Sequence, residues 1–306
     1  ITSIKFGNNY NEIIRRYSDN LLRVEYGDEY NQEIHDNDGD NERCYLPDSV
    51  ISIKFGEKFN KPIGKFPENL RYLEFGTQFD SPILELPLKV EHIKFGGNYN
   101  RSLYEEYGVK KRSDRSQIMK KTFKLPISIR HIELGKHYTK SLDGVLHEGL
   151  DTLIINGEFN SAINGLPSTL RELTLLGLYD QPVDNLPEKL EKLVLGNNFD
   201  KPVNKLPIGL KELVIGNSFN QEINSLPPGL LRLDIGDHFD REIENGPPWM
   251  EDNYETLYAE RLRDSEFDAY SLIVNVLPKT LIYLKFGRNF NQNMFGLPRS
   301  LQQLEL

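Results

Sequence analysis

The sequence predicts a repeat solenoid with a parallel β-sheet on its concave face and little helix on its convex side. Two observations predict this fold. A glycine followed three residues later by a phenylalanine or tyrosine recurs along the chain, and most successive copies of that aromatic residue lie 20 residues apart. A repeat this short cannot bury an apolar side by itself, so neighbouring repeats must cover it by stacking.

The glycine of each repeat marks the end of a predicted strand. We expect it to adopt a positive φ in a tight turn, because glycine tolerates that conformation without steric cost. Two imperfect copies carry Asn156 and Leu176 instead. The glycines at this position, called anchor glycines below, are Gly7, Gly27, Gly56, Gly76, Gly96, Gly135, Gly196, Gly216, Gly236 and Gly287.

The other consensus positions complete one coil, which reads L-P-x-x-L-x-x-L-x-φ-G-x-x-F-N-x-P-I, where φ is phenylalanine or an aliphatic residue. The segment Leu-x-x-Leu-x-φ has the period of a strand, as in Leu210, Leu213 and Ile215. The aromatic residue and the aliphatic residue four positions later should face the core. Leu-Pro restarts the chain in an extended conformation. Each coil should therefore be a strand, a turn and an extended return.

We expect a single solenoid over residues 1–306, built of about 12–13 coils. Three gaps between aromatic anchors exceed one repeat and indicate insertions near residues 35–44, 104–122 and 246–274. All three fall between the inward aliphatic residue and the next Leu-Pro, so they should emerge along one flank. Because Ile1 falls in the middle of a repeat, we expect the chain to be a fragment of a longer one.

Composition restricts the functional classes. The chain has 37 Lys+Arg against 46 Asp+Glu, a formal charge of -9, which argues against a general nucleic-acid binder. No run approaches the ~18 apolar residues of a membrane span. The single cysteine, Cys44, excludes an internal disulfide framework. We therefore expect protein partners, no nucleic acid or membrane partner, no metal, no cofactor and a cytoplasmic location.

The repeat resembles the FNIP repeat, a divergent leucine-rich repeat. The string Phe59-Asn60-Lys61-Pro62-Ile63 occurs literally, Phe79-Asp80-Ser81-Pro82-Ile83 is one step from it, and the pattern covers nearly the whole chain apart from the insertions. The resemblance implies a leucine-rich-repeat-like solenoid. The family is best known from social amoebae and giant viruses. It is often joined to an F-box, which implies substrate recruitment to a cullin-type ubiquitin ligase, in the host cytoplasm if the protein is viral.

A polar column follows the aromatic column. In leucine-rich solenoids a buried asparagine amide both donates to and accepts from backbone groups of adjacent coils, and we interpret this column as such a structural ladder. Aspartate occurs in four copies and can only accept, so those positions should be wetter or use backbone N–H groups alone. The asparagines assigned to the ladder are Asn60, Asn100, Asn160, Asn220 and Asn291.

Two columns of each strand should point outward, two and four residues before the anchor glycine. The first column alternates in sign over six consecutive coils, so that stacking places each lysine between two carboxylates. These ladders either neutralise a crowded sheet or form part of a contact surface. The six residues, called the charge ladder below, are Lys5, Glu25, Lys54, Glu74, Lys94 and Glu133.

Further along, the first column becomes apolar, and three rings lie beside the charged half. An exposed aliphatic strip and aromatic anchors are typical of interfaces, although aliphatic residues on a strand also satisfy β propensity. We assign a partner-binding role on the concave face to these positions. They are Tyr72, His92, His131, Ile154, Thr174, Val194 and Val214.

Each insertion has a functional and a plain interpretation. Alternate carboxylates over 36–42 resemble the start of a calcium loop, but Gly39 and Pro47 do not fit its sixth and twelfth positions, which favours a solvated loop. The basic segment 104–122 is either a solvated loop or a site for an anionic partner. The segment 246–274 has helical spacing from Tyr254 to Leu262 and should dock on the flank, or else bind a partner.

No catalytic motif stands out. The phosphate-cradling, H-E-x-x-H and G-x-S-x-G patterns are absent, and we assign no catalytic residue. The favoured function is a protein–protein interaction scaffold, with the substrate-recognition part of an F-box-type ubiquitin ligase adaptor as its specific form. The alternatives are a structural or assembly component of a virus particle, in which self-association is expected, and an enzyme, which is disfavoured.

Overall fold

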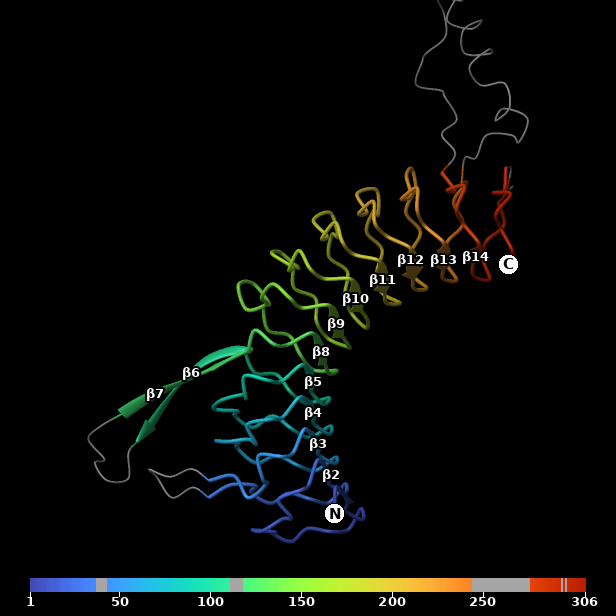
Figure 1. Ribbon diagram of the computed structural model, residues 1–306. Coiled ribbons are helices and arrows are strands. Elements are labelled where there is room, and N and C mark those ends of the chain that lie inside the picture. The colour runs from blue at the N-terminus through green and yellow to red at the C-terminus, as the bar shows by residue number, and fades with distance from the viewer. Residues whose placement is uncertain (37–42, 111–117, 244–275, 293, 295) are drawn as a thin grey trace, which may run out of the picture. The chain divides into compact units, whose positions relative to one another are not determined.

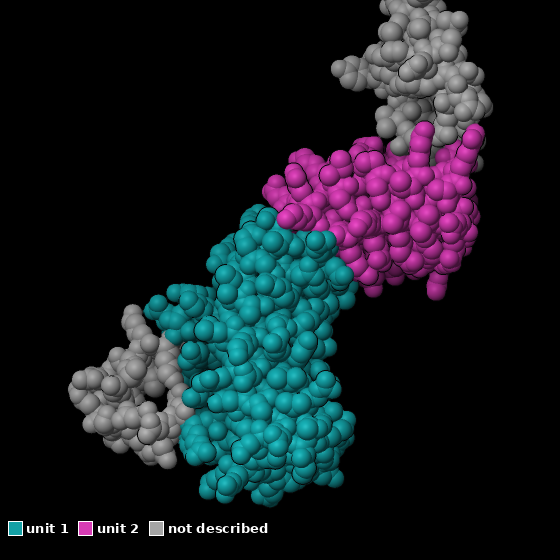
Figure 2. Space-filling model, in the orientation of Figure 1, with its two compact units in different colours: residues 1–179 teal, residues 180–306 magenta. Residues whose placement is uncertain are grey.

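The computed structural model describes residues 1–36, 43–110, 118–243, 276–292, 294 and 296–306. The chain forms two compact units, residues 1–179 and 180–306 (Figure 2), and each is described by itself. Strands, turns and extended segments make up the described residues, and none of these residues lies in a helix. Accordingly, no described segment is a helix that could span a membrane.

In unit 1, short strands stack side by side in a parallel sheet (Figure 1) in the order β1-β2-β3-β4-β5-β8-β9-β10. Sequence neighbours are neighbours in the sheet, except that β6 and β7 lie outside it. The strands are β1 Ser3–Lys5, β2 Arg23–Glu25, β3 Ser52–Lys54, β4 Tyr72–Glu74, β5 His92–Lys94, β8 His131–Leu134, β9 Thr152–Ile155 and β10 Glu172–Leu175.

Unit 2 repeats the arrangement. Its strands follow the order β11-β12-β13-β14-β15, and the pairs are parallel. The strands are β11 Lys192–Leu195, β12 Glu212–Ile215, β13 Arg232–Ile235, β14 Tyr283–Lys285 and β15 Gln303–Glu305.

Equivalent positions of successive coils are paired. Lys54 lies opposite Glu74 between β3 and β4, and Lys94 lies opposite Glu133 between β5 and β8. The register survives the insertions, since β5 pairs with β8 across 104–122 and β13 pairs with β14 across the longest gap. The predicted parallel solenoid of strand, turn and extended return is confirmed.

The consensus apolar positions form the core. Leu210, Leu213 and Phe219 are fully buried, and Ile223 is nearly so. The aromatic anchors stack from coil to coil, with ring centroids 5.9 Å apart for Phe59 and Phe79. Burying each large side chain against the next coil contributes roughly 1.5–3 kcal/mol. The core is therefore continuous within each unit and is built only by stacking.

The anchor glycines serve a different purpose from the predicted one. None of Gly27, Gly56, Gly76 and Gly96 has a positive φ. Instead, a Cβ built on any of them would collide with the carbonyl group of the anchor glycine one coil earlier. In the two imperfect copies the glycine comes one residue later and does have a positive φ, 93° at Gly157 and 69° at Gly177. Glycine is thus required mainly because neighbouring backbones approach too closely for a side chain.

The asparagine column is an acceptor ladder rather than the buried two-way ladder that we predicted. The Oδ1 of Asn60 accepts the backbone N–H of Asp80 at 3.0 Å, and the Oδ1 of Asp80 accepts that of Asn100 at the same distance. In the same way, Asn100 Oδ1 accepts the backbone N–H of Thr139, and Asn220 Oδ1 accepts that of Asp240. Asp240 Oδ1 accepts the backbone N–H of Asn291. These side chains are exposed or half-buried. Because the side chain only has to accept, aspartate replaces asparagine without loss.

The insertions are described only in part. The described part of segment 104–122 is not a loop, since β6 Tyr104–Lys110 and β7 Ile118–Lys124 pair as the two strands of an antiparallel hairpin. It leaves the solenoid on the side away from the sheet (Figure 1). His35 and Cys44 form an antiparallel bridge at the base of the first insertion. The calcium-loop positions 37–42 and the predicted helix within 246–274 lie outside the described residues.

Replacing an anchor glycine inside the stack should destabilise the protein strongly. We expect Gly76→Ala to lower the free energy of unfolding by about 2 kcal/mol or more, because its Cβ meets the Gly56 backbone, which cannot yield. Denaturant unfolding measures the loss. Gly7→Ala is the matched control, since nothing lies within 4 Å of its Cβ. Equal unfolding midpoints for the two variants would contradict the close-approach explanation.

The ladder should tolerate aspartate and reject a residue without an acceptor. We expect Asn60→Asp to be nearly neutral and Asn60→Ala to cost about 0.5–1.5 kcal/mol, because the alanine leaves the N–H of Asp80 without its acceptor. Thermal unfolding of the two variants at neutral pH provides the comparison. If aspartate were as harmful as alanine, the amide donor would matter and a one-way ladder would be the wrong description.

Candidate protein-interaction surface

The outer sheet face of unit 1 carries most of the predicted candidates. Side chains two and four residues before the anchor glycine point away from the core, since the residues that alternate with them are buried. The first column is the charge ladder defined above. The second contains Tyr72, His92 and His131 on adjacent strands β4, β5 and β8, and these three are called the ring column below.

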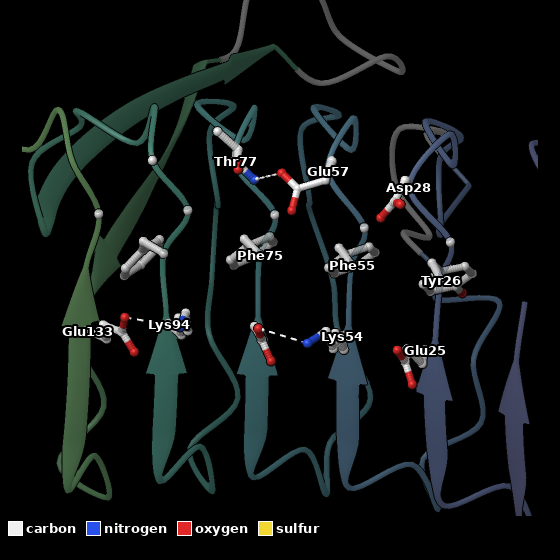
Figure 3. A pocket seen from close by; sticks show the side chains of 18 of the residues that line it. Glu25, Tyr26, Asp28, Lys54, Phe55, Glu57, Phe75, Thr77, Lys94 and Glu133 are labelled. Atoms are coloured by element: carbon white, nitrogen blue, oxygen red, sulfur yellow. Dashed lines mark hydrogen bonds and ion pairs between the residues drawn. The ribbon is translucent and has the colours of Figure 1, made fainter. Parts of the chain in front are cut away.

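The charge ladder consists of ion pairs between coils. Lys5 Nζ lies 2.7 Å from Glu25 Oε1, Lys54 Nζ lies 3.0 Å from Glu74 Oε1, and Lys94 Nζ lies 3.0 Å from Glu133 Oε1. Figure 3 shows Lys54, Lys94 and Glu133 in one row across the strands. Most of these side chains remain well exposed, for example 49% for Lys54 and 37% for Glu74, whereas Glu133 is 22% exposed. Such exposed pairs each contribute ~0.2–1 kcal/mol.

The pairing alternates along the ladder. We predicted that each lysine would lie between two carboxylates, and the register does place Lys54 between Glu25 and Glu74. Its hydrogen bond is made to Glu74 alone. That bond is the main cause of the raised pKa of Lys54, which burial opposes and the charge of Glu25 supports. Lys54 thus has one close partner, Glu74, and a second carboxylate, Glu25, that acts at longer range.

A shallow hollow lies on each side of the charge ladder. One hollow is bounded by the ladder and by turn residues, among them Asp28, Glu57 and Thr77, which lie beyond the rings of Tyr26, Phe55 and Phe75 in Figure 3. The other is bounded by the ladder and the ring column. The outer face is therefore ridged, and a partner can contact the ladder from the top and from both sides.

The ring column is a continuous stack. The rings of Tyr72 and His92 lie 4.9 Å apart at their centroids, and those of His92 and His131 lie 5.3 Å apart. Tyr72 is 44% exposed, whereas the two histidines are half-buried. An exposed aromatic ring held by a stacked neighbour binds a partner with little loss of side-chain entropy.

The stack affects the protonation of its last member. Burial lowers the pKa of His131, and the neighbouring His92 lowers it further, followed by a smaller effect of Lys94 in the same direction. Glu133 and Glu172 oppose these effects. His131 therefore favours the neutral imidazole, which stacks on His92 without a charge to repel it.

The predicted apolar positions lie on the outer sheet face of their own unit but are less exposed than a free strip would be. In unit 1, Ile154 and Thr174 lie opposite each other on β9 and β10. In unit 2, Val194 and Val214 lie opposite each other on β11 and β12. All four are half-buried. The structure brings each pair together, and a partner-binding role for them stays a prediction.

Unit 2 contains a polar cluster around Tyr283, a residue that we did not predict. The guanidinium carbon of Arg232 lies 3.8 Å from the ring centroid of Tyr283, and Arg232 also pairs with Asp234 at 3.3 Å. Asp234 in turn pairs with Lys285 at 3.3 Å. Tyr283 was not singled out, although it lies four residues before an anchor glycine, at the position of Tyr72 in its own repeat. The position four residues before the anchor glycine, considered in every repeat, identifies Tyr283 from the sequence.

Metal-ligand clusters and the reactivity of the single cysteine can be assessed for the described residues. In the described parts of the chain, no cluster of three or more histidine, cysteine, aspartate or glutamate side chains could hold a metal ion. Burial raises the pKa of Cys44 to about 12, so its thiol is a poor nucleophile at neutral pH.

The lowered pKa of His131 predicts a pH dependence of stability. Because the folded protein takes up this proton less readily than the unfolded chain, the stabilisation is complete above the ordinary pKa of 6.5 and is lost as the pH falls toward the folded pKa. We expect an NMR titration to give His131 a pKa below 6.5 and His92→Gln to raise it. An unchanged His131 pKa in that variant would contradict the effect assigned to His92.

Comparisons with known proteins agree with this geometry. The FNIP Repeat family matches residues 42–78, 59–98, 202–238 and 268–306. The crystal structure of CroV588, a circular leucine-rich repeat protein from a giant virus, is 26% identical over 98% of this chain with a TM-score of 0.62. The present chain spans about half of CroV588, since the alignment covers 49% of that protein.

A second structure, YopM from Yersinia enterocolitica WA-314, is 16% identical, with 94% of this chain and 64% of YopM covered and a TM-score of 0.38. The search of curated proteins found no match. The family matches include the literal Phe59–Ile63 string, and the parallel stacking of coils is that of a leucine-rich-repeat-like solenoid. The chain therefore contains FNIP repeats, which the family model matches in these four segments, within a leucine-rich-repeat-like solenoid.

Proposed function

We propose that this protein is a protein–protein interaction scaffold that binds its partner through the outer sheet face. The observation that carries the proposal is the ring column beside the charge ladder. Tyr72 offers an exposed ring that is held in place by His92, and the neighbouring hollow gives a partner access to charged side chains on its other side. Interfaces are enriched in aromatic anchors of this kind.

The fold supports a binding role. Leucine-rich-repeat-like solenoids typically present one sheet face to protein partners, because stacking yields a long surface with regularly spaced positions. The family whose model matches is a repeat family rather than a catalytic one. We propose that the chemistry in which the protein takes part belongs to its partners, and that it acts in the cytoplasm.

The more specific form of the proposal is substrate recognition within an F-box-type ubiquitin ligase adaptor. The FNIP repeats support it, because the resemblance to that family implies this association. A component of a virus particle is the second candidate, favoured by the likeness to a giant-virus protein. The two differ in their partner, which is a ligase substrate in the first case and another copy or another particle component in the second.

Affinity capture with face variants tests the proposal. We expect Tyr72→Ala to weaken partner capture by about fivefold or more, because the exposed ring is the anchor. Val194→Glu/Val214→Glu tests the apolar positions in the same way. Lys211→Ala is the control, since Lys211 forms an ion pair with Glu191 outside the two columns. A set of captured proteins that is the same for all four chains, each with wild-type thermal stability, would reject the assigned face.

A further inference from the structure

The charge ladder has a symmetry that follows from its length and alternation. It contains six positions, Lys and Glu in turn, and begins with lysine and ends with glutamate. A two-fold axis parallel to the strands, placed between β3 and β4, reverses the order of the coils. In the reversed order, each lysine of the first copy lies opposite a glutamate of the second copy, and each glutamate lies opposite a lysine. A strictly alternating series of even length is therefore complementary to itself.

The pairs that such an axis creates are specific. Lys54 would face Glu74 of the second copy, Glu25 would face Lys94, and Lys5 would face Glu133. Each pair occurs twice, as the two-fold relation demands. Every one of the six contacts joins opposite charges. A series of odd length, or one with a single break in its alternation, would instead place like charges together.

The carboxylates have capacity for such contacts. Glu25, Glu74 and Glu133 each form an ion pair through Oε1 with a lysine of their own chain. Their Oε2 atoms have no hydrogen bond or ion pair within the described residues, and an ionised carboxylate accepts at both oxygens. Each lysine ammonium likewise has three N–H groups. A second ladder can therefore bind without breaking the ion pairs inside the first.

The ring column fits the same axis. The axis places the exposed ring of Tyr72 opposite Ser52 of the second copy. Ser52 is the small residue that occupies the position of Tyr72 in the preceding coil. Arg23 then falls opposite the ring of His92, and a guanidinium stacks favourably on such a ring. The centre of the ladder thus coincides with a large side chain facing a small one.

We propose that the outer face of unit 1 binds a second copy of the same unit through the charge ladder, with the two-fold axis between β3 and β4. The inference rests on the proposed function, because it names a partner for the face already assigned to protein binding. Exposed ion pairs are individually weak, so the dimer is reversible and its affinity falls steeply with ionic strength.

Charge-reversal variants of the purified protein test this arrangement. Lys54→Glu places two Glu–Glu contacts at the centre of the dimer, and Glu74→Lys places two Lys–Lys contacts there. We expect each variant alone to dimerise at least about tenfold more weakly than the wild type in sedimentation equilibrium. An equimolar mixture should restore the affinity, because both central contacts of the mixed dimer join opposite charges.

Lys211→Glu is the matched control. It makes the same charge change and breaks an ion pair of 2.6 Å in unit 2, so it should leave the wild-type dimer affinity unchanged. For the wild type, raising the salt concentration from about 0.05 to 0.5 M should weaken the dimer by roughly tenfold or more. Circular dichroism of each variant establishes that the coils remain folded.

Three results would overturn the inference: a wild-type chain that stays monomeric at low salt, a mixture that stays as weak as its two components, or equal weakening by Lys211→Glu. None of them affects the scaffold proposal, which depends on the capture of other proteins and on Tyr72→Ala. Conversely, the captured proteins could be the same for wild type and face variants while the mixture of Lys54→Glu and Glu74→Lys regains the wild-type dimer affinity. That combination would leave self-association as the role of this face.

Discussion

Close approach of the backbone at the anchor glycines is the constraint on which each unit depends. Where one coil turns at Gly56 and the next at Gly76, no space remains for a side chain between them. This contact fixes the spacing of the coils at their turns, and the strand hydrogen bonds fix it along the sheet. Equivalent residues are consequently brought together in every coil, and single residues become columns with collective properties.

Three columns show what this repetition produces. Inside, aromatic rings stack to give a core that no coil could form alone. At the turn, an oxygen of one coil accepts the backbone N–H of the next, as Asn60 does for Asp80. On the outer face, opposite charges pair between coils while keeping much of their exposure. Stability is thus concentrated on the inner side and at the turns rather than on the outer face.

Sequence periodicity was sufficient to predict the parallel sheet, its register and the residues of the outer columns, because side-chain direction in a strand depends only on position. Periodicity could not predict why Gly76 is a glycine. A close approach between coils and a positive φ both require glycine, so the sequence does not distinguish these two causes. It also missed the hairpin at 104–122, whose pairing depends on a partner strand that the repeat pattern does not describe. Periodicity predicted that Tyr72, His92 and His131 are neighbours. It could not predict that their rings stack, because side-chain torsion angles do not follow from the position in the repeat.

The pairing of β5 with β8 has a consequence for how such proteins diversify. Lys94 and Glu133 meet in register although a whole hairpin is inserted between their coils, so the sheet is indifferent to the length of the return segment. New loops or small domains grafted at this point would leave the rest of the stack intact. The return, for example between Ile83 and Leu86, is therefore a permissive position both for evolutionary elaboration and for engineered insertion.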